Sequence, residues 1–329
     1  MGRRRSPILA IAALLVVAVG SRGATKTLAQ AGRLIEQGRY AEAEPILRAE
    51  LGRTGQETTM RAVLLDGLGV VYMQQARYLE AERMFRRSLL VYGKLGLEHS
   101  LAGASPLANL GLVYVHLRYC RKAEPLLRQA LDIQRKERGQ AHPDTAVLLS
   151  NLSEVYRGLE RYAEAEQGLR EAQAILESAL GADDAALAAP LNNLAVLCHT
   201  RGRTPEAIVL AERAVRIEER AAGPDHPELA QTLANLAGLY TAAGRRADAA
   251  GLFLRALSIA ERGLGAEHPT TGNILHLYST LLHSMKRHGE AKATEKRAQA
   301  ILERSEHENL QHHTVDVKVL LASRYRASR

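Results

Sequence analysis

The stretch GPDHPELAQTLANLAGLY at residues 223–240 decides the fold. Its Pro227 is followed by an acid and then by apolar residues at helical spacing, which predicts a helix that begins near the proline. Proline costs no hydrogen bond at the first helical position, and an acid there is stabilised by the helix dipole. Asn235 nevertheless lies in the middle of this helix, although asparagine is a poor helix former that prefers caps and turns. It therefore needs a role other than forming the helix.

The same phrase recurs along the chain at intervals of 42 residues. The interval holds for a glycine, an asparagine and an alanine of each unit: Gly139, Gly181, Gly223 and Gly265; Asn109, Asn151, Asn193 and Asn235; and Ala81, Ala123, Ala165, Ala207, Ala249 and Ala291. A further unit precedes these at a spacing of 38 residues, from Ala43 to Ala81. Self-similarity at a fixed interval of this length is the signature of a repeat architecture. Seven units are expected over residues 25–304.

Each unit is expected to contain two helices. The first begins at a proline after a histidine, as in HPDT at 142–145, and runs for about 16 residues to a polar turn. The second begins at motifs like RYAEAE, found at 39–44 and 161–166, and ends at the glycine of the next unit. Two helices joined by so short a turn pack antiparallel, and recurring alanines such as Ala165 and Ala172 allow their close approach.

The composition supports an all-helical chain. It is 46% hydrophobic, with no Trp and two Phe among 329 residues, and the alternating β-branched or aromatic runs typical of strands are almost absent. The sequence therefore predicts an all-α solenoid of about seven antiparallel helix pairs. Residues 305–329 fall outside the interval and are expected to form a cap and a basic tail. Pro106 and Pro190 lie inside expected first helices and should shorten or kink them.

These motifs carry a resemblance to a known family. The RYAEAE type of turn, the LxNLAxLY phrase and the G-x-x-H-P linker resemble tetratricopeptide repeats of the kinesin light chain variety, which also occur widely in bacteria. The match covers about 280 of the 329 residues. It implies a right-handed superhelix with a concave groove that holds extended peptides. Cys198 and Leu282 depart from the pattern at its tyrosine, and Gly67 and Leu277 depart at its asparagine.

The first 20 residues form a separate segment. A basic start is followed by apolar residues from Ile8 to Val19, and Ala18 and Gly20 fit the cleavage site of a secretory signal. The apolar run would span only about 18 Å as a helix, less than the roughly 30 Å of a hydrocarbon core. We therefore expect a signal peptide at residues 1–20 and an exported protein, periplasmic or extracellular. The alternative is a membrane anchor over residues 8–20.

The recurring asparagines lie on a face that the core does not use. In the helix quoted above, Leu233 and Leu236 belong to the core face, whereas Gln231 and Asn235 share a small, polar face. The resemblance implies that this face lines the concave groove. A side-chain amide can both donate to and accept from a peptide backbone, so a ladder of such amides could hold an extended segment. Alternatively, the amides bond to the neighbouring first helix and stitch the repeats together, and the two roles are compatible.

Other positions on the same helices extend this prediction. Asn192 doubles the amide of the central unit, and Glu154, Arg157 and His199 vary between units, as positions that choose among ligands would. The predicted peptide-binding residues are Asn109, Asn151, Asn192, Asn193, Asn235, Gln231, Glu154, Arg157 and His199. The expected partner is a protein or peptide. The rival interpretation is a structural spacer of a cell-envelope complex that acts through its ends or its convex face, with the asparagines as stitching.

Sites of other classes have less support. His276 and His283 share a helix face and His312 and His313 lie in the tail, but no third ligand and no H-E-x-x-H accompany them, so we expect no metal, cofactor or catalytic residues. An enzymatic function would depend on this histidine-rich third of the chain.

The charge and the cysteines exclude two further classes. The net charge of +8 comes from basic residues that alternate with acids on both helices of each unit, which is unlike a nucleic-acid footprint. Cys120 and Cys198 are almost two repeats apart, too far for a disulfide, and are expected to line the core.

Overall fold

The computed structural model describes residues 22–55 and 57–305. The expected signal peptide at residues 1–20, its alternative as an anchor over residues 8–20, and the tail from residue 306 onward lie outside the described residues. His312 and His313 therefore lie outside them as well. Among the helices described, none is long and apolar enough to cross a membrane.

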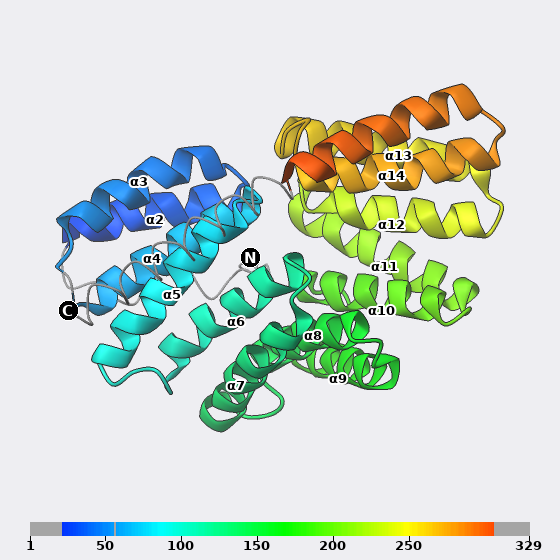
Figure 1. Cartoon of the computed structure of the whole chain (residues 1–329). Helices are drawn as coiled ribbons and strands as arrows, with labels where there is room; N and C mark the ends of the chain where they lie inside the picture. Colours follow the sequence, from blue (N-terminus) through cyan, green and yellow to red (C-terminus); the bar gives the residue numbers. More distant parts are fainter. Residues whose placement is uncertain (1–21, 56, 306–329) are drawn as a thin grey trace, which may run out of the picture.

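Seven antiparallel helix pairs follow one another over residues 22–305 as described, which confirms the predicted all-α solenoid (Figure 1). We call the members of each pair the first and second helix, the loop within a pair the turn, and the loop between pairs the linker. The first helices are α2 (Arg22–Glu36), α4 (Thr59–Gln74), α6 (Leu101–His116), α8 (Pro143–Gly158), α10 (Ala188–Thr200), α12 (Leu229–Ala242) and α14 (Pro269–Ser284). The second helices are α3 (Tyr40–Arg53), α5 (Tyr78–Lys94), α7 (Cys120–Arg138), α9 (Tyr162–Leu180), α11 (Thr204–Ala222), α13 (Arg246–Gly263) and a last helix over residues 288–305.

The His-Pro linkers start their first helices with a side-chain cap. Nδ1 of His142 accepts a hydrogen bond from the backbone N–H of Asp144 at 3.1 Å, and Nδ1 of His268 accepts one from Thr270 at the same distance. His226 makes the equivalent bond at 3.4 Å. Each ring thus satisfies one of the N–H groups that a first helical turn leaves without an intrahelical partner. This cap explains why histidine recurs beside proline.

Linkers and turns place different demands on the backbone. Gly139 has φ 91° and ψ 166°, and Gly181 and Gly223 repeat this conformation, which essentially only glycine adopts. The turns use a left-handed residue instead, which is Ala76 (φ 58°) in one unit and Glu160 (φ 60°) in another. Residues other than glycine reach that conformation at moderate cost. The linker glycine is therefore fixed by backbone geometry, whereas the turn position tolerates several residues.

Small side chains let the two helices of a pair approach closely. Ala165 and Ala172 are completely buried, as their recurrence predicts. A Cβ added at Gly69 would lie 2.5 Å from a ring carbon of Phe85, and one added at Gly111 would lie 2.7 Å from Leu127 Cγ. Both positions therefore need glycine for the packing that they make.

The hydrophobic core is continuous along the solenoid. Its buried clusters share residues such as Leu210 at their borders, so it continues from pair to pair. Cys198 is buried in this core and Cys120 is half-buried, and both are free thiols.

The two prolines inside first helices have different outcomes. Pro190 is the third residue of α10, which has 13 residues and follows a short 3-10 helix at Ala185–Leu187, whereas α6 and α8 each have 16 residues. The predicted shortening thus occurs at Pro190. Pro106 lies within α6 and does not shorten it, so the prediction of a shorter helix is wrong there.

The pairs stack into a curved arc with the first helices on the inner side (Figure 1). From α4 onward, each first helix contacts the next first helix directly, whereas consecutive second helices make no comparable contact within the described residues. The elements that lie closer together occupy the inside of a curved stack of repeats. The polar face that carries the asparagines therefore belongs to the helices that line the inner face of the arc.

Candidate functional site

We call the recurring asparagines Asn109, Asn151, Asn193 and Asn235 the ladder. Three of these four residues donate a hydrogen bond to the preceding first helix. Their Nδ2 groups donate to a side chain 43 residues earlier, from Asn109 to Asp66 Oδ1 at 3.4 Å, from Asn193 to Ser150 Oγ at 3.4 Å, and from Asn235 to Asn192 Oδ1 at 3.1 Å. In each case the acceptor residue lies directly before the position of the previous unit that is equivalent to the asparagine. Hydrogen bonds between consecutive first helices are what the interpretation of the asparagines as stitching between repeats requires.

Asn151 differs from the other three members. The position 43 residues before it is Ala108, whose side chain offers no acceptor. Within the described part of the chain, the amide of Asn151 makes no hydrogen bond, and its side chain is half-buried on α8. Buried or half-buried polar groups normally have a partner in the protein, in water or in a ligand. The amide of Asn151 is therefore available to water or to a ligand.

The central and later units add amides around the ladder. Asn192 accepts from Asn235, and Gln231 Nε2 donates to Asn235 Oδ1 at 3.0 Å. Asn192, Gln231 and Asn235 thus form a continuous chain of amides between α10 and α12. All three are half-buried, so each keeps part of its surface on the inner face.

Asp66 is a buried acid that the sequence interpretation missed. It is 3% exposed and accepts hydrogen bonds from Ser105 Oγ at 2.9 Å and from Asn109. Burial raises the pKa of its carboxyl group to about 7, although the bonds from Ser105 and Asn109 oppose the shift. The repeat interval could have revealed this residue, because Asp66 stands one unit before Ala108, at the position where later units carry Ser150 and Asn192.

The three residues predicted to select ligands do not form one cluster. Glu154 and Arg157 are neighbours on α8, with a loose ion pair of 3.8 Å. His199 is exposed at the end of α10, and its Nδ1 lies 3.0 Å from Thr204 Oγ1 of the same unit.

Glu154 instead lies near His116 of the preceding unit. His116 is exposed at the end of α6, and the negative charge of Glu154 favours the charged form of its imidazole. The His116 ring stacks on Tyr78, with the two ring centres 5.0 Å apart. Neither His116 nor Tyr78 was predicted as a site residue, although Tyr78 is the tyrosine of an RYAEAE type of turn, RYLEAE at 77–82.

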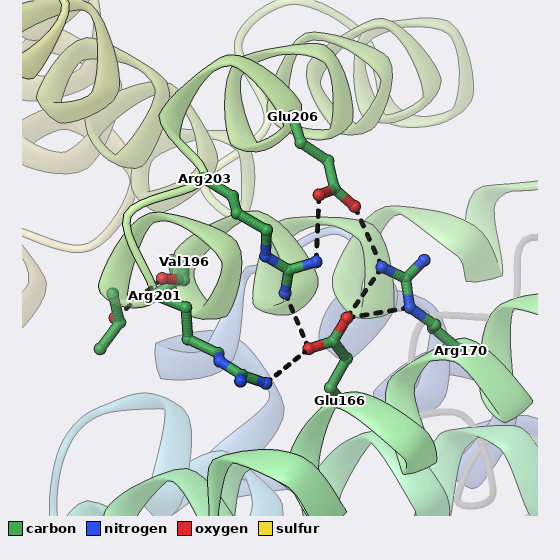
Figure 2. A network of polar contacts seen from close by, with 7 residues as sticks. Glu166, Arg170, Val196, Arg201, Arg203 and Glu206 are labelled. Carbon is green, nitrogen blue, oxygen red and sulfur yellow. Dashed lines mark hydrogen bonds and ion pairs between the residues drawn. The ribbon is translucent and has the colours of Figure 1, made fainter.

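Most charged side chains pair along the turns and second helices. Figure 2 shows one such group, in which Glu166 of α9 contacts Arg201 at 3.1 Å and Arg203 at 2.7 Å. Arg170 bridges Glu166 and Glu206, at 2.8 Å and 3.0 Å. The side chains of this network are 17–49% exposed, so each ion pair contributes little individually, and the group works by linking α9 to the next turn and α11.

Ion pairs of this kind explain why arginine, tyrosine and glutamate recur in the RYAEAE type of turn. Arg161 bonds to Glu164 three residues later and to Glu124 of the previous second helix, and its guanidinium lies 4.5 Å from the ring centre of Tyr156. The arginine therefore joins two repeats while stacking on the tyrosine that ends the first helix. Where Cys198 replaces that tyrosine, Arg203 keeps the two equivalent ion pairs, with Glu166 and Glu206, but has no tyrosine ring to stack on.

The histidines near the C-terminal end do not gather. His283 lies 3.8 Å from Glu295 and near the ring of His288, and His276 is exposed on the same helix. In the described ranges, no group of three or more His, Cys, Asp or Glu side chains is placed to hold a metal ion.

Several solved structures share this architecture. They include a Rap conjugation gene regulator of plasmid pLS20 in complex with the Phr* peptide, with 16% identity, 89% of this chain and 79% of that chain covered, and a TM-score of 0.67. NprR in complex with its cognate peptide NprX has 15% identity, covers 89% and 86%, and has a TM-score of 0.65. BtubC (BKLC) from P. vanneervenii has 24% identity, covers 73% and 91%, and has a TM-score of 0.48. No curated protein sequence matches the chain.

The family assignment agrees with the helix pairs. Tetratricopeptide repeats match residues 60–136, 104–178, 144–220, 187–262 and 235–304, which together span every unit from α4 to the last helix. The predicted resemblance is therefore confirmed, and the chain belongs to the tetratricopeptide repeat family.

Proposed function

We propose that this protein is a non-enzymatic interaction scaffold that holds an extended peptide, or a flexible segment of a partner protein, along the inner face of its first helices. The residues assigned to this role are those predicted from the sequence, with Asn151 at the centre. The predicted export of the protein belongs to the same proposal and depends on residues 1–20 alone.

The observation that carries the proposal is the amide of Asn151. Asn109, Asn193 and Asn235 each have an acceptor on the preceding helix, so their presence is accounted for by stitching. Asn151 has Ala108 at the equivalent position of the preceding first helix and so has no such acceptor, yet an asparagine stands in the middle of α8, where alanine would form a better helix. A ligand backbone supplies the partner that the protein does not.

The chemistry of the inner face fits a backbone ligand. Towards the inside, α10 and α12 offer amides and small residues, and Glu154 with Arg157 supplies charge on α8. Amides recognise peptide N–H and C=O groups irrespective of sequence, whereas the few charged positions can discriminate between side chains. Two of the similar solved structures contain peptides, Phr* and NprX, which supports this class of ligand.

A synthetic array of random-sequence peptides tests the proposal. The full chain and the Asn151→Ala variant would be compared on it, with binding of selected peptides then measured in solution. Losing one or two neutral hydrogen bonds of 0.5–1.5 kcal/mol each should weaken binding about threefold to about a hundredfold, while the helix content stays unchanged. Arg170→Ala is the matched control, because it removes an ion pair of the network in Figure 2, which involves the second helices α9 and α11, and should not affect peptide binding. Equal binding by the Asn151→Ala variant and the wild type would refute the role of Asn151.

A structural spacer is the second candidate, and the three stitching bonds favour it. In that case the inner face has no ligand, and partners bind at the ends or on the convex face. The array would then show no peptide bound above background to the wild-type chain. Partners captured by the wild type would also be retained by the Asn151→Ala variant.

A further inference from the structure

The two arms of the arc meet at one junction. In Figure 1 the turn after α4 lies beside the linker that precedes α14. Nε2 of His268, in that linker, lies 3.1 Å from the carbonyl oxygen of Gln74, which is 194 residues earlier in the chain. A cavity of about 690 Å³ lies here, lined by residues 75–77, 79–80, 264–269 and 304–305. We call this junction the seam.

The contact between the arms occurs twice. A Cβ added at Gly38 would lie 3.5 Å from Pro227 Cγ, so the turn of the first helix pair packs against the linker before the sixth. At the seam, the turn of the second pair meets the linker before the seventh. Each turn thus meets the linker that lies five pairs further along, as expected for a superhelix with a regular rotation between repeats. The same relation places the turn of the third pair opposite the residues that follow the seventh pair.

The chain leaves the described residues where this third contact would form. The described part of the last helix ends at residue 305, one interval of 42 residues after Gly263, the last residue of α13. Residues 306–311, which lie outside the described residues, therefore have the place in the chain that residues 264–269 of the cavity lining have one unit earlier. On the opposite arm, the positions equivalent to the lining are 117–119 and 121–122.

The turn of the third pair has an exceptional charge. In the other described turns, an arginine pairs with an acid three residues later: Arg39 with Glu42, Arg77 with Glu80, Arg161 with Glu164, Arg203 with Glu206, Arg245 with Asp248, and Arg287 with Glu290. In the third turn these two positions are Tyr119 and Lys122, so the pair cannot form. The turn instead has three exposed cations, Arg118, Arg121 and Lys122, which we call the basic turn.

The cations of the basic turn have no acidic partner. None of the three makes an ion pair within the described residues, and the contact of Lys122 is with the ring of Tyr119, 4.8 Å from its centre. Arg121 and Lys122 also lie in the first turn of α7, where the helix dipole disfavours positive charge. Whereas α3, α5, α9, α11 and α13 each have an acid in the first turn, α7 has none. A carboxylate placed here would be stabilised by the cations and by the dipole.

The residues after the last helix supply the complementary charge. The stretch 306–317 contains Glu306, Glu308 and Asp316 and has no Lys or Arg. Glu306 and Glu308 fall within the six residues that the seam relation places opposite the basic turn. Because this segment is covalently attached beside the seam, its effective concentration at the basic turn is of the order of millimolar, which favours it over a free acidic ligand.

We propose that the basic turn is a docking surface for residues 306–311 of the same chain, which bind there as a third contact between the arms. Glu306 and Glu308 pair with the three cations, and the seventh helix pair is thereby joined to the third. The contact extends the seam from two turns to three and fastens the C-terminal end of the arc. It does not depend on a ligand at the inner face.

Carbodiimide cross-linking of the unmodified full chain tests the contact. This reagent joins a lysine amine directly to a carboxylate that it touches, so we expect an amide between Lys122 Nζ and Glu306 or Glu308, identified by mass spectrometry of the digested monomer. Lys136, exposed about 21 Å further along α7, is the internal control and should give no such product. Salt at about 1 M should lower the Lys122 product several-fold, because it screens exposed ion pairs. A mixture of isotopically light and heavy chains separates products within one chain from products between two.

A distance measurement tests the same contact without cross-linking. Spin labels would be placed at Leu90→Cys, which is exposed on α5, and at Asn309→Cys, in a full chain that also carries Cys120→Ser and Cys198→Ala. A docked segment should give one narrow distance distribution. Circular dichroism would confirm that the labelled chain keeps the helix content of the wild type.

Reversing charges on each side separates docking from loss of folding. Arg118→Glu with Arg121→Glu should broaden the distribution and lower the Lys122 product at least about twofold, since an exposed ion pair shifts an equilibrium by about 1.4-fold to fivefold. Adding Glu306→Arg and Glu308→Arg to that chain should narrow the distribution again, which damage to the fold would not do. Lys136→Glu reverses a charge at the other end of α7 and should behave as the wild type.

Three results would overturn the proposal. A wild-type chain without a Lys122 product, or with products only between light and heavy chains, would show that the segment does not dock in its own chain. A distribution equally broad with and without the basic turn would show that these cations do not hold it. Failure of the combined reversal to narrow the distribution, in a chain with full helix content, would show that charge pairing is not the cause.

Discussion

Two neighbouring interfaces on the inner face use the same asparagine position differently. Between α4 and α6, Asn109 donates to the buried Asp66, and Asn109 itself is only 9% exposed. Between α6 and α8, the position that would supply an acceptor is Ala108, and Asn151 is half-buried and makes no hydrogen bond within the described part of the chain. Each asparagine thus depends on the residue 43 positions earlier. Where that residue is Asp66, the asparagine is hydrogen-bonded within the protein, and where it is Ala108, the amide has no such bond. One repeated residue type therefore has two roles.

This difference separates stability from binding along the ladder. An amide that completes a buried network affects folding when it is removed, because its partner is left without a hydrogen bond. Removing an amide that has no protein partner should leave folding almost unchanged. The substitutions below follow this gradient, from the interface where the side chains matter most for folding to the one where they matter least.

The largest effect is expected at Asp66. Its pKa is raised from an ordinary value of 3.8 to about 7 in the folded protein, so the folded state holds a proton that the unfolded state releases. Stability from this group is fully present below about pH 4 and is lost as the pH rises to about 7, by up to about 1.4 kcal/mol for each pH unit. Asp66→Asn should remove this slope and make the chain more stable than the wild type at about pH 8. Urea unfolding measured across the pH range checks this, and a parallel slope in both proteins would contradict it.

Asn109→Ala should have the next largest effect. The change removes one of the two side-chain donors of Asp66 and leaves that buried oxygen with one bond fewer. The cost of about 1–2 kcal/mol is partly offset by the better helix propensity of alanine, so a net loss of about 1 kcal/mol is expected. The loss should be larger at about pH 8 than at about pH 4, because an ionised carboxylate depends more on its donors. A variant as stable as the wild type at both pH values would show that this bond contributes nothing.

Much of the fold could be predicted from the sequence because its information is local and repeated. The linker glycines adopt a conformation that almost only glycine reaches, and His142 and His268 cap helices through atoms two residues away. Every such feature involves neighbours in the chain or one repeat interval. A 42-residue interval therefore predicts the helix pairs and their order, whereas the inner position of the asparagines is what the resemblance to the family implies.

The contact between the two ends of the arc and the burial of Asp66 do not follow from a local or repeated pattern. The contact of His268 with Gln74 depends on small rotations between repeats that accumulate over five units, and no residue pattern states their sum. Asp66 could have been found by aligning the units, but its burial depends on how α4 and α6 pack. Pro106 also shows the limit, since α6 keeps its full length although a proline lies inside it. Tertiary packing decided these points.

A smaller effect is expected where α8 meets α10. Ser150→Ala removes the oxygen that accepts from Asn193 at 3.4 Å, a long neutral bond at a half-buried site. The loss should be about 0.5 kcal/mol, less than for Asn109→Ala, because no carboxylate is involved. Thermal unfolding of the two variants side by side would check the order. A larger loss for Ser150→Ala would mean that the neutral bond, rather than the buried acid, dominates the stitching.

The smallest effect on folding is expected for Asn151→Ala, and a reciprocal change sharpens the comparison. Asn151→Ala should leave the free energy of unfolding within about 0.5 kcal/mol of the wild type, since no protein bond is lost and alanine favours the helix. Ala108→Ser introduces an acceptor at the position where Ser150 serves Asn193, so it should engage Asn151 and stabilise the chain by about 0.5 kcal/mol. The same change should weaken peptide binding, because the amide is then occupied. If Ala108→Ser instead left both stability and peptide binding unchanged, the position before the ladder would not control what Asn151 does.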